Sequence, residues 1–328
     1  MVCPRDCSFD IIYYNTIFDA NKNNFKCKKI VTLVINSLLD DNDVNVKLEF
    51  IKANNIDSIK FSFYSFQPEN NVIINFINQL PLCVKYFTFY IAMSETASEC
   101  ASSFANLPYD LQYLDLSSYC NFHLDMLPMG LKSLSLGYDF NKPLDNLPNG
   151  LESLHIEGIY NHTLDNLPDS IKYLHLDLHN FTLPINKLPN SLVYLELNLN
   201  INIIEYMLQN VVYPDKLETF AFLIHNMPSF GEYGYMYDIS KLNFPKKLKT
   251  FILGEPVNTV LNKLTIPANT EILHLNMFYD LDNLTEMHDS VKKCYINNSQ
   301  YEIDNVRKKL SNARNRFPNC QFIANTIE

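Results

Sequence analysis

The sequence predicts an α/β repeat solenoid, in which one parallel β-sheet is backed by helices or short irregular segments. The first observation is a unit spelled Leu-Pro-x-x-Leu-x-x-Leu-x-Leu, clearest at residues 147–156. Its other openings lie at 107, 127, 167 and 188, so the period is 20 or 21 residues. The second observation is that the last six positions of this unit also fit segments on both sides, between residues 30 and 296.

Each unit is predicted to form a corner followed by a strand. Side chains alternate along a strand, so Leu154 and Ile156 are predicted to point into the core, whereas Ser153 and His155 point outward. Proline cannot donate a backbone hydrogen bond, which favours a corner at the Leu-Pro opening. One coil cannot bury its leucines alone, so stability has to come from stacking neighbouring coils.

The first part of the chain is predicted to contain helices. Residues 1–29 form an N-terminal cap segment, and residues 30–106 hold longer repeats whose spacing leaves room for a helix between strands. Apolar residues at helical spacing predict helices at 43–54 and 69–79. A third helix is predicted at about 94–105, where Ser or Thr caps its start.

The rest of the chain is predicted to continue the same solenoid as one domain. Residues 107–212 hold short repeats, followed by degenerate repeats at 213–296 and a C-terminal helical cap at 297–328. The short coils have no room for a regular helix, except near 203–210. The degenerate repeats are expected to contain an insert at 225–242. The C-terminal cap is expected to contain a basic helix at 301–316 that ends before Pro318.

An asparagine follows each of four middle strands, at Asn121, Asn141, Asn161 and Asn180. Aligned amides can satisfy backbone groups of the adjacent coil at a bend, which predicts a stacked ladder. The alternative is simple turn propensity in an Asn-rich chain. Aromatic residues recur beside these positions, which favours the ladder.

Composition excludes several classes of function. The formal net charge of −10 argues against a nucleic-acid surface and leaves a basic protein partner open. No apolar run is long enough to predict a membrane span. The first residues lack the apolar stretch of a secretion signal, so we expect an intracellular, cytoplasmic protein whose eight cysteines are reduced.

Residues 140–148, Phe-Asn-Lys-Pro-Leu-Asp-Asn-Leu-Pro, and the similar residues 161–168 resemble the FNIP repeat, a short class of leucine-rich repeat. The resemblance is specific over residues 107–197 and weaker over 213–296. It implies a leucine-rich-repeat solenoid, with a curved parallel β-sheet on the concave side. It also implies that partners bind on that side.

The resemblance has further implications for origin and partners. FNIP-repeat proteins are typical of amoebae and of the giant viruses that infect them, so a viral chain would act on its host in the host cytoplasm. Some carry an N-terminal F-box, which implies a substrate-recognition subunit of a ubiquitin ligase. Only 29 residues precede the first predicted strand and we find no F-box in them, although residues 9–14 can pack on the first coil. A link to a ligase through another subunit stays an alternative.

Catalytic and metal-binding motifs are scarce. No nucleophile elbow, phosphate-binding loop, zinc-protease motif or dinucleotide fingerprint occurs. Cys3, Cys7 and Cys27 lack the paired spacing of a zinc site. His155, His175 and Glu196 occupy neighbouring outward positions that could hold a metal or exchange protons, but a polar strand surface explains them better. We predict no enzyme, no cofactor and no metal, and a metal-dependent or hydrolytic enzyme is the disfavoured alternative.

The predicted function is protein–protein interaction through outward-facing side chains. Tyrosine is enriched at interfaces, although strand propensity also places it on sheets. The insert is predicted either to contact the partner or to fold onto the flank, and the basic helix either to bind an acidic partner or to be a solvated cap. The candidate partner-binding residues are Tyr113, His155, Tyr173, His175, Tyr194, Glu196, Phe230, Tyr233, Tyr235 and Tyr237.

Overall fold

The structure is a computed structural model of the 328-residue chain. It consists of two compact units, Met1–His162 and Thr163–Glu328, which we call unit 1 and unit 2 and describe separately. The residues that the structure describes are 9–14, 30–35, 41–63, 70–91, 106–116, 121, 123–124, 126–199, 201–224, 245, 247–254, 266–276, 287–298 and 303–326.

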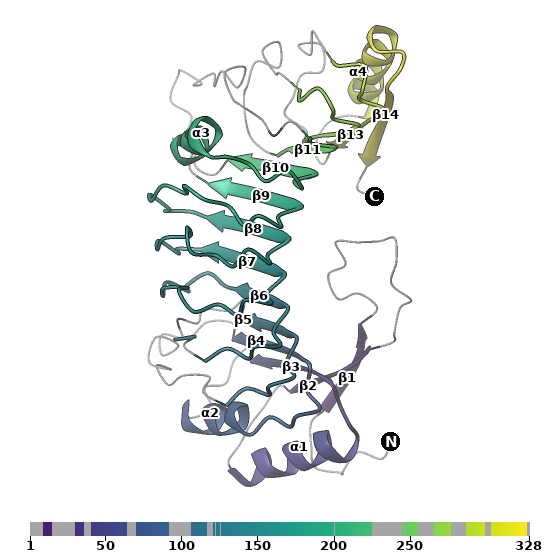
Figure 1. Ribbon diagram of the computed structural model, residues 1–328. Coiled ribbons are helices and arrows are strands. Elements are labelled where there is room, and N and C mark those ends of the chain that lie inside the picture. The colour runs from purple at the N-terminus through teal and green to yellow at the C-terminus, as the bar shows by residue number, and fades with distance from the viewer. Residues whose placement is uncertain are drawn as a thin grey trace. The chain divides into compact units, whose positions relative to one another are not determined.

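Unit 1 is built on a single sheet whose strands follow the order of the chain (Figure 1). The first strand is antiparallel to the second, and each later pair within the unit is parallel. Two helices follow the second and third strands and pack on each other. The elements are β1 Phe9–Tyr14, β2 Ile30–Ile35, α1 Asp41–Ala53, β3 Ser58–Phe63, α2 Asn70–Asn78, β4 Tyr86–Ile91, β5 Tyr113–Leu116, β6 Ser133–Leu136 and β7 Ser153–Gly158.

Unit 2 repeats this plan with parallel strands throughout its described part. Its last helix packs on its last strand, as expected for an element that covers the end of a stack. The elements are β8 Tyr173–Leu178, β9 Tyr194–Leu199, α3 Ile201–Asn210, β10 Thr219–Ile224, β11 Thr250–Leu253, β12 Ile272–Asn276, β13 Lys293–Asn298, α4 Ile303–Arg316 and β14 Gln321–Thr326. Both units are therefore solenoids of the leucine-rich-repeat kind, which confirms the predicted fold class.

The core of each unit consists of columns of inward-facing side chains. In unit 1, Leu134 lies opposite Leu154 in the register of β6 and β7. In unit 2, Leu174 lies opposite Leu195 in β8 and β9. All four side chains are at most 1% exposed. Each leucine is thus covered by the same residue of the next coil, which explains why the repeat demands the same residue type at this position.

The Leu-Pro opening forms the predicted corner. The amide of Leu151 donates to the carbonyl oxygen of Pro148 at 3.0 Å, so Asn149 and Gly150 are the central residues of a turn. Thr270 closes the same turn with a bond to Pro267 and is fully buried, although its hydroxyl has no hydrogen-bond partner among the described residues. The other corners with this bond to proline are those of Val84, Leu111, Leu131, Ile171, Leu192 and Leu217.

The helices predicted from apolar spacing are confirmed where the structure describes them. The segments predicted at 43–54, 69–79, 203–210 and 301–316 are α1, α2, α3 and α4, with ends that differ by at most two residues. No helix occurs among the described residues 126–199, as the short period of these coils requires. The helix predicted at 94–105 and the insert at 225–242 lie outside the described residues.

The predicted asparagine ladder is present in unit 1. The side-chain oxygen of Asn121 accepts the backbone N–H of Asn141 at 2.9 Å, and the oxygen of Asn141 accepts that of Asn161 at 3.0 Å. The corner precedes each strand and the asparagine follows it, so the ladder joins successive coils beyond the C-terminal ends of their strands. Asn180 belongs to unit 2, and its part in the ladder stays a prediction.

Asn141→Ala is expected to lower the free energy of unfolding by about 1 kcal/mol, because the amide of Asn161 loses its acceptor. The backbone bond from Asn141 to Asn121 stays in place. Urea unfolding followed by circular dichroism measures the change. The exposed Asn146 makes a matched control, and its replacement by Ala is expected to change stability by less than about 0.5 kcal/mol. Equal losses from the two variants would show that the ladder adds nothing.

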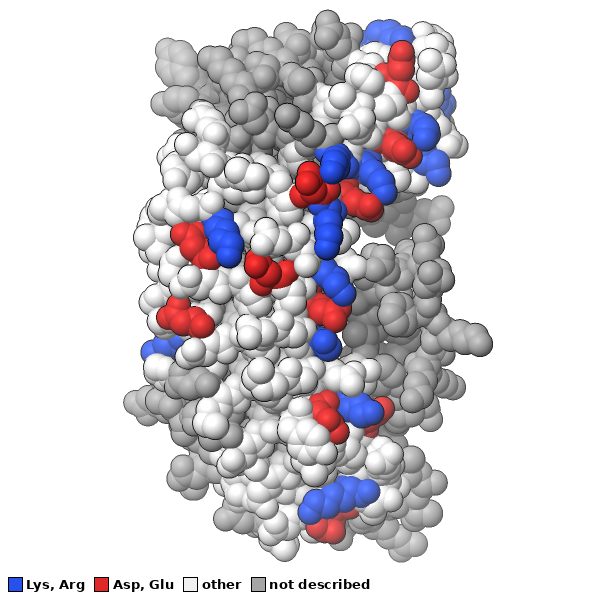
Figure 2. Space-filling view, in the orientation of Figure 1, with Lys and Arg blue, Asp and Glu red and all other residues white. Residues whose placement is uncertain are grey.

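We call the residue that follows each corner the strand-entry position. Charged side chains of opposite sign occupy it in neighbouring coils at Lys132 and Glu152 in unit 1, and at Glu218, Lys249, Glu271 and Lys292 in unit 2, whereas Gln112 and Val193 are uncharged. The carbonyl oxygen at this position accepts two N–H groups of the next coil, as when Lys132 accepts from Glu152 and Ser153 at 2.8 and 3.0 Å. Neighbouring strand-entry positions are thus held together by backbone hydrogen bonds. Figure 2 shows basic side chains (blue) next to acidic ones (red) on the surface. The side-chain ion pairs are Lys132–Glu152 at 3.3 Å in unit 1, and Lys249–Glu218 at 2.7 Å and Lys292–Glu271 at 3.2 Å in unit 2.

Candidate functional site

The outward-facing side chains of the strands form a surface that we call the strand face. The burial pattern of β5 to β8 alternates along each strand, so outward residues are half-buried and inward residues are fully buried. The predicted division of each strand into a core set and a surface set is therefore confirmed.

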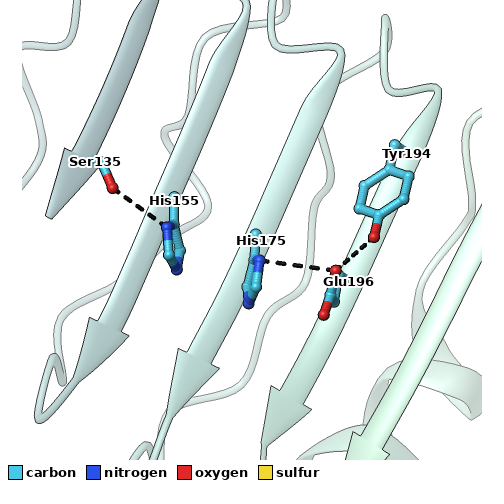
Figure 3. A network of polar contacts seen from close by, with 5 residues as sticks. All are labelled: Ser135, His155, His175, Tyr194 and Glu196. Atoms are coloured by element: carbon cyan, nitrogen blue, oxygen red, sulfur yellow. Dashed lines mark hydrogen bonds and ion pairs between the residues drawn. The ribbon is translucent and has the colours of Figure 1, made fainter. Parts of the chain in front are cut away.

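On the strand face of unit 1, polar side chains contact each other along and across the strands. The hydroxyl of Tyr113 donates to Asp115 Oδ2 at 3.4 Å, and burial together with the charge and hydrogen bond of Asp115 raises the pKa of the phenol above its usual range. Ser135 Oγ lies 3.2 Å from His155 Nδ1 on the next strand (Figure 3). Of the predicted contact residues, Tyr113 and His155 therefore lie on this face, two strands apart.

On the strand face of unit 2, four of the predicted contact residues lie together on β8 and β9. The register places Tyr173 opposite Tyr194 and His175 opposite Glu196. Two residues further along, Asp177 lies opposite Asn198. We call these six residues, Tyr173, His175, Asp177, Tyr194, Glu196 and Asn198, the β8–β9 patch.

Glu196 is the centre of the contacts in the β8–β9 patch (Figure 3). The hydroxyl of Tyr194 donates to Glu196 Oε2 at 2.5 Å, and His175 Nδ1 lies 3.7 Å from the same oxygen. Burial, then the hydrogen bond and charge of Glu196, raises the pKa of Tyr194 above its usual range. The phenol therefore stays protonated at neutral pH and remains a donor to the carboxylate.

Asn198 was not predicted as a site residue, but the structure makes it the most unusual member of the patch. It is only 9% exposed, and no described residue forms a hydrogen bond with its side-chain oxygen. By alternation along β9, its side chain projects from the same face as Glu196. Tyr194, Glu196 and Asn198 are the first, second and third outward positions of β9. A polar residue at the third of these positions is the sequence signal that could have identified Asn198 as a site residue.

The remaining predicted contact residues are not placed. Phe230, Tyr233, Tyr235 and Tyr237 lie in the insert, outside the described residues. On the basic helix α4, Arg314 donates to the carbonyl oxygen of Phe322 at 3.1 Å, and the guanidinium of Arg316 lies 5.3 Å from the centre of the Phe317 ring. At least these two cations therefore contact the end of their own unit.

Metal and nucleophile chemistry finds little support in the described part of the chain. No group of three or more His, Cys, Asp or Glu residues that could hold a metal ion occurs there. Cys83, Cys294 and Cys320 are free thiols, and burial raises the pKa of Cys320 to about 11. Such thiols are protonated at neutral pH and are poor nucleophiles. Cys3, Cys7 and Cys27 lie outside the described residues. The described helices include none that is both long and apolar enough to span a membrane.

A second exposed feature, not predicted from the sequence, runs along three corners of unit 1. The residue after the corner proline is apolar at Leu82, Tyr109 and Met129, which are 58%, 65% and 73% exposed. Later coils have Asn149 and Asp169 at this position. These three residues, which we call the apolar corner, are a useful comparison surface because they lie away from the strand face.

Comparison with known proteins agrees with the repeat seen in the fold. The family model of the FNIP repeat matches residues 121–158, which include β6 and β7, and residues 160–200, which include β8 and β9. No curated protein matches the chain. The chain therefore contains FNIP repeats at residues 121–158 and 160–200, as the sequence of its short coils predicts.

Proposed function

We propose that this chain is a non-enzymatic, intracellular scaffold that binds a protein partner through its strand face. The observation that carries the proposal is the separation of two side-chain sets along each strand. The inward set is buried and uniform, as at Leu154 and Leu174. The outward set is half-buried and differs from coil to coil, as at Ser153 and Tyr173, so it can be adapted to a partner without loss of the core.

The β8–β9 patch has the composition of a contact surface. Tyr173 and Tyr194 lie opposite each other, and their rings offer apolar area at a small cost in conformational entropy. The polar groups beside them are held in place by the contacts of Glu196 with Tyr194 and His175. Side chains that are already held in place lose less conformational entropy on binding than side chains that rotate freely.

The net charge of −10 supports a protein partner over a nucleic acid, because a nucleic acid requires a concentrated basic surface. The lack of a metal-holding group among the described residues supports binding over catalysis.

The double variant Tyr173→Ser, Tyr194→Ser is expected to lose at least ~10-fold in partner binding, because two central tyrosines of an interface are removed. Serine occupies the same repeat position at Ser133 and Ser153, so the coil geometry accepts it. The measurement is affinity capture from lysate of the source cell with quantitative mass spectrometry. Proteins retained by the wild type and lost from the variant are the expected result.

The control for this experiment is Tyr109→Ser, which removes an exposed tyrosine of the apolar corner. Circular dichroism and thermal unfolding of each variant show that the fold is kept. If Tyr109→Ser abolishes capture and the strand-face variant does not, the contact surface is the apolar corner and the proposal is wrong. Ubiquitin-ligase subunits among the captured proteins would favour the ligase alternative.

A further inference from the structure

The β8–β9 patch has oxygen acceptors for which the described residues provide no donor. Tyr194 and His175 both lie against Oε2 of Glu196, and no described residue forms a hydrogen bond or ion pair with Oε1. Figure 3 shows the second oxygen of Glu196 pointing away from Tyr194. The oxygen of Asn198 is buried and likewise has no donor in the described part of the chain. A buried acceptor without a donor destabilises the protein, so the Asn198 oxygen favours a ligand that donates a hydrogen bond. The Glu196 side chain is 19% exposed, so its Oε1 can be reached by the same ligand.

The charge of this surface is one-sided. Asp177 lies opposite Asn198 in the register and adds a second carboxylate to that of Glu196. Its Oδ1 lies 3.7 Å from Nε2 of His179. The strand-face positions of β8, β9 and β10 whose side chains the structure describes are Tyr173, His175, Asp177, Tyr194, Glu196, Asn198, Thr219 and Ala221. None of these described positions is Lys or Arg, so a cationic group is the complementary ligand.

We infer that the β8–β9 patch binds the guanidinium group of an arginine presented by the protein partner. A guanidinium carries five N–H donors in a planar fork, so it can bind several acceptors at once, which the compact ammonium group of lysine does less well. The rings of Tyr173 and Tyr194 offer faces on which a guanidinium can stack. The inference rests on the proposed function and names the chemical group that the partner must present.

A nuclear magnetic resonance titration tests the inference with three small probes in the presence of EDTA. The probes are the N-acetyl N-methylamides of arginine, lysine and citrulline, and the reporters are the ring signals of Tyr194 and His175. Citrulline has the shape of arginine without its charge. The expected result is saturable shifts with the arginine probe, binding that is several-fold weaker with lysine, and no binding with citrulline.

Glu196→Gln is expected to weaken binding of the arginine probe at least ~10-fold, since a charged acceptor is lost while Gln can still accept from Tyr194. Asp177→Asn is expected to weaken it as well. The matched control is Asp215→Asn, which neutralises a carboxylate that is 90% exposed in the same unit and pairs with Lys247. This control is expected to bind like the wild type.

Three results would overturn the inference: no shift with arginine, equal shifts with citrulline, or an equal loss of binding in the Asp215 control. The proposed function is judged separately by the capture experiment. Capture that depends on Tyr173 and Tyr194, together with no binding of the arginine probe, refutes the inference and keeps the proposed function. Capture that is unchanged in the double variant refutes the proposed function itself.

Discussion

Gly158→Ala is expected to lower the free energy of unfolding by about 3–5 kcal/mol. Gly158 ends β7 with a φ of +93°, a region that residues with a side chain rarely adopt. A methyl group at this position would lie 2.6 Å from the carbonyl carbon of Tyr138, and closer still to its oxygen and Cα. The backbone of the neighbouring coil would have to move, and the bond from Ile159 N to the Tyr138 oxygen would be lost with it. Urea unfolding followed by circular dichroism measures the loss.

The control for this variant is Gly150→Ala in the corner of the same coil. Its added methyl group would meet Lys132 Nζ at 3.6 Å and Met129 O at 3.7 Å, which are ordinary contacts. We expect its stability to be unchanged or raised by up to about 1 kcal/mol, because alanine restricts the unfolded chain. Similar losses of stability from both variants would show that the close approach of Gly158 to the backbone of Tyr138 is not what makes the substitution costly.

Leu154→Ala is expected to lower the free energy of unfolding by about 2–5 kcal/mol, from lost burial and the cavity left behind. Leu154 is 1% exposed and lies opposite Leu134 in the register. The coil of Leu134 is held by the same column, so the cavity cannot close without shifting that neighbouring strand. Urea unfolding gives the magnitude.

The matched control is Leu82→Ala, which makes the same chemical change at a side chain that is 58% exposed. Its expected cost is below about 0.5 kcal/mol. If the two variants lose the same amount, the inward column is not the source of stability.

The repeat made most of the fold predictable because one position serves the same purpose in every coil. Leu151 closes a corner and Leu154 fills a column, and both requirements recur at a fixed spacing that can be read from residue types. Thr270 shows the limit of the pattern, since it keeps the corner with a residue that the leucine spelling does not include.

Features that depend on the backbone path were not predictable. Nothing in the sequence around Gly158 distinguishes a glycine with positive φ from one in an ordinary turn such as Gly150. The antiparallel pairing of β1 with β2 was likewise not predicted, because the repeat pattern does not extend to residues 9–14.

The candidate site was predicted in part. Alternation along the strand placed Tyr173, His175, Tyr194 and Glu196 on one surface, and register then brought them together. The unpartnered oxygen of Asn198 could not be foreseen, since burial of an outward residue depends on packing above the sheet. The asparagine ladder of unit 1 was predictable because its members share one residue type. In unit 2, Tyr206 donates to Asn186, and Asn186 donates to Asp165. This chain of hydrogen bonds was not predictable, because its three members differ.

The alternating strand-entry charges have a consequence for how such a chain can grow or shrink. In the coils of Glu218, Lys249, Glu271 and Lys292, the inward residues and the strand-entry backbone bonds recur, so they do not by themselves oppose the loss of one coil. Loss of the coil of Lys249 would set Glu218 beside Glu271, two like charges in direct register. Loss of the coils of Lys249 and Glu271 together would set Glu218 beside Lys292 and keep the alternation. In this stretch of unit 2, a pair of coils is therefore the module that can be gained or deleted without electrostatic conflict.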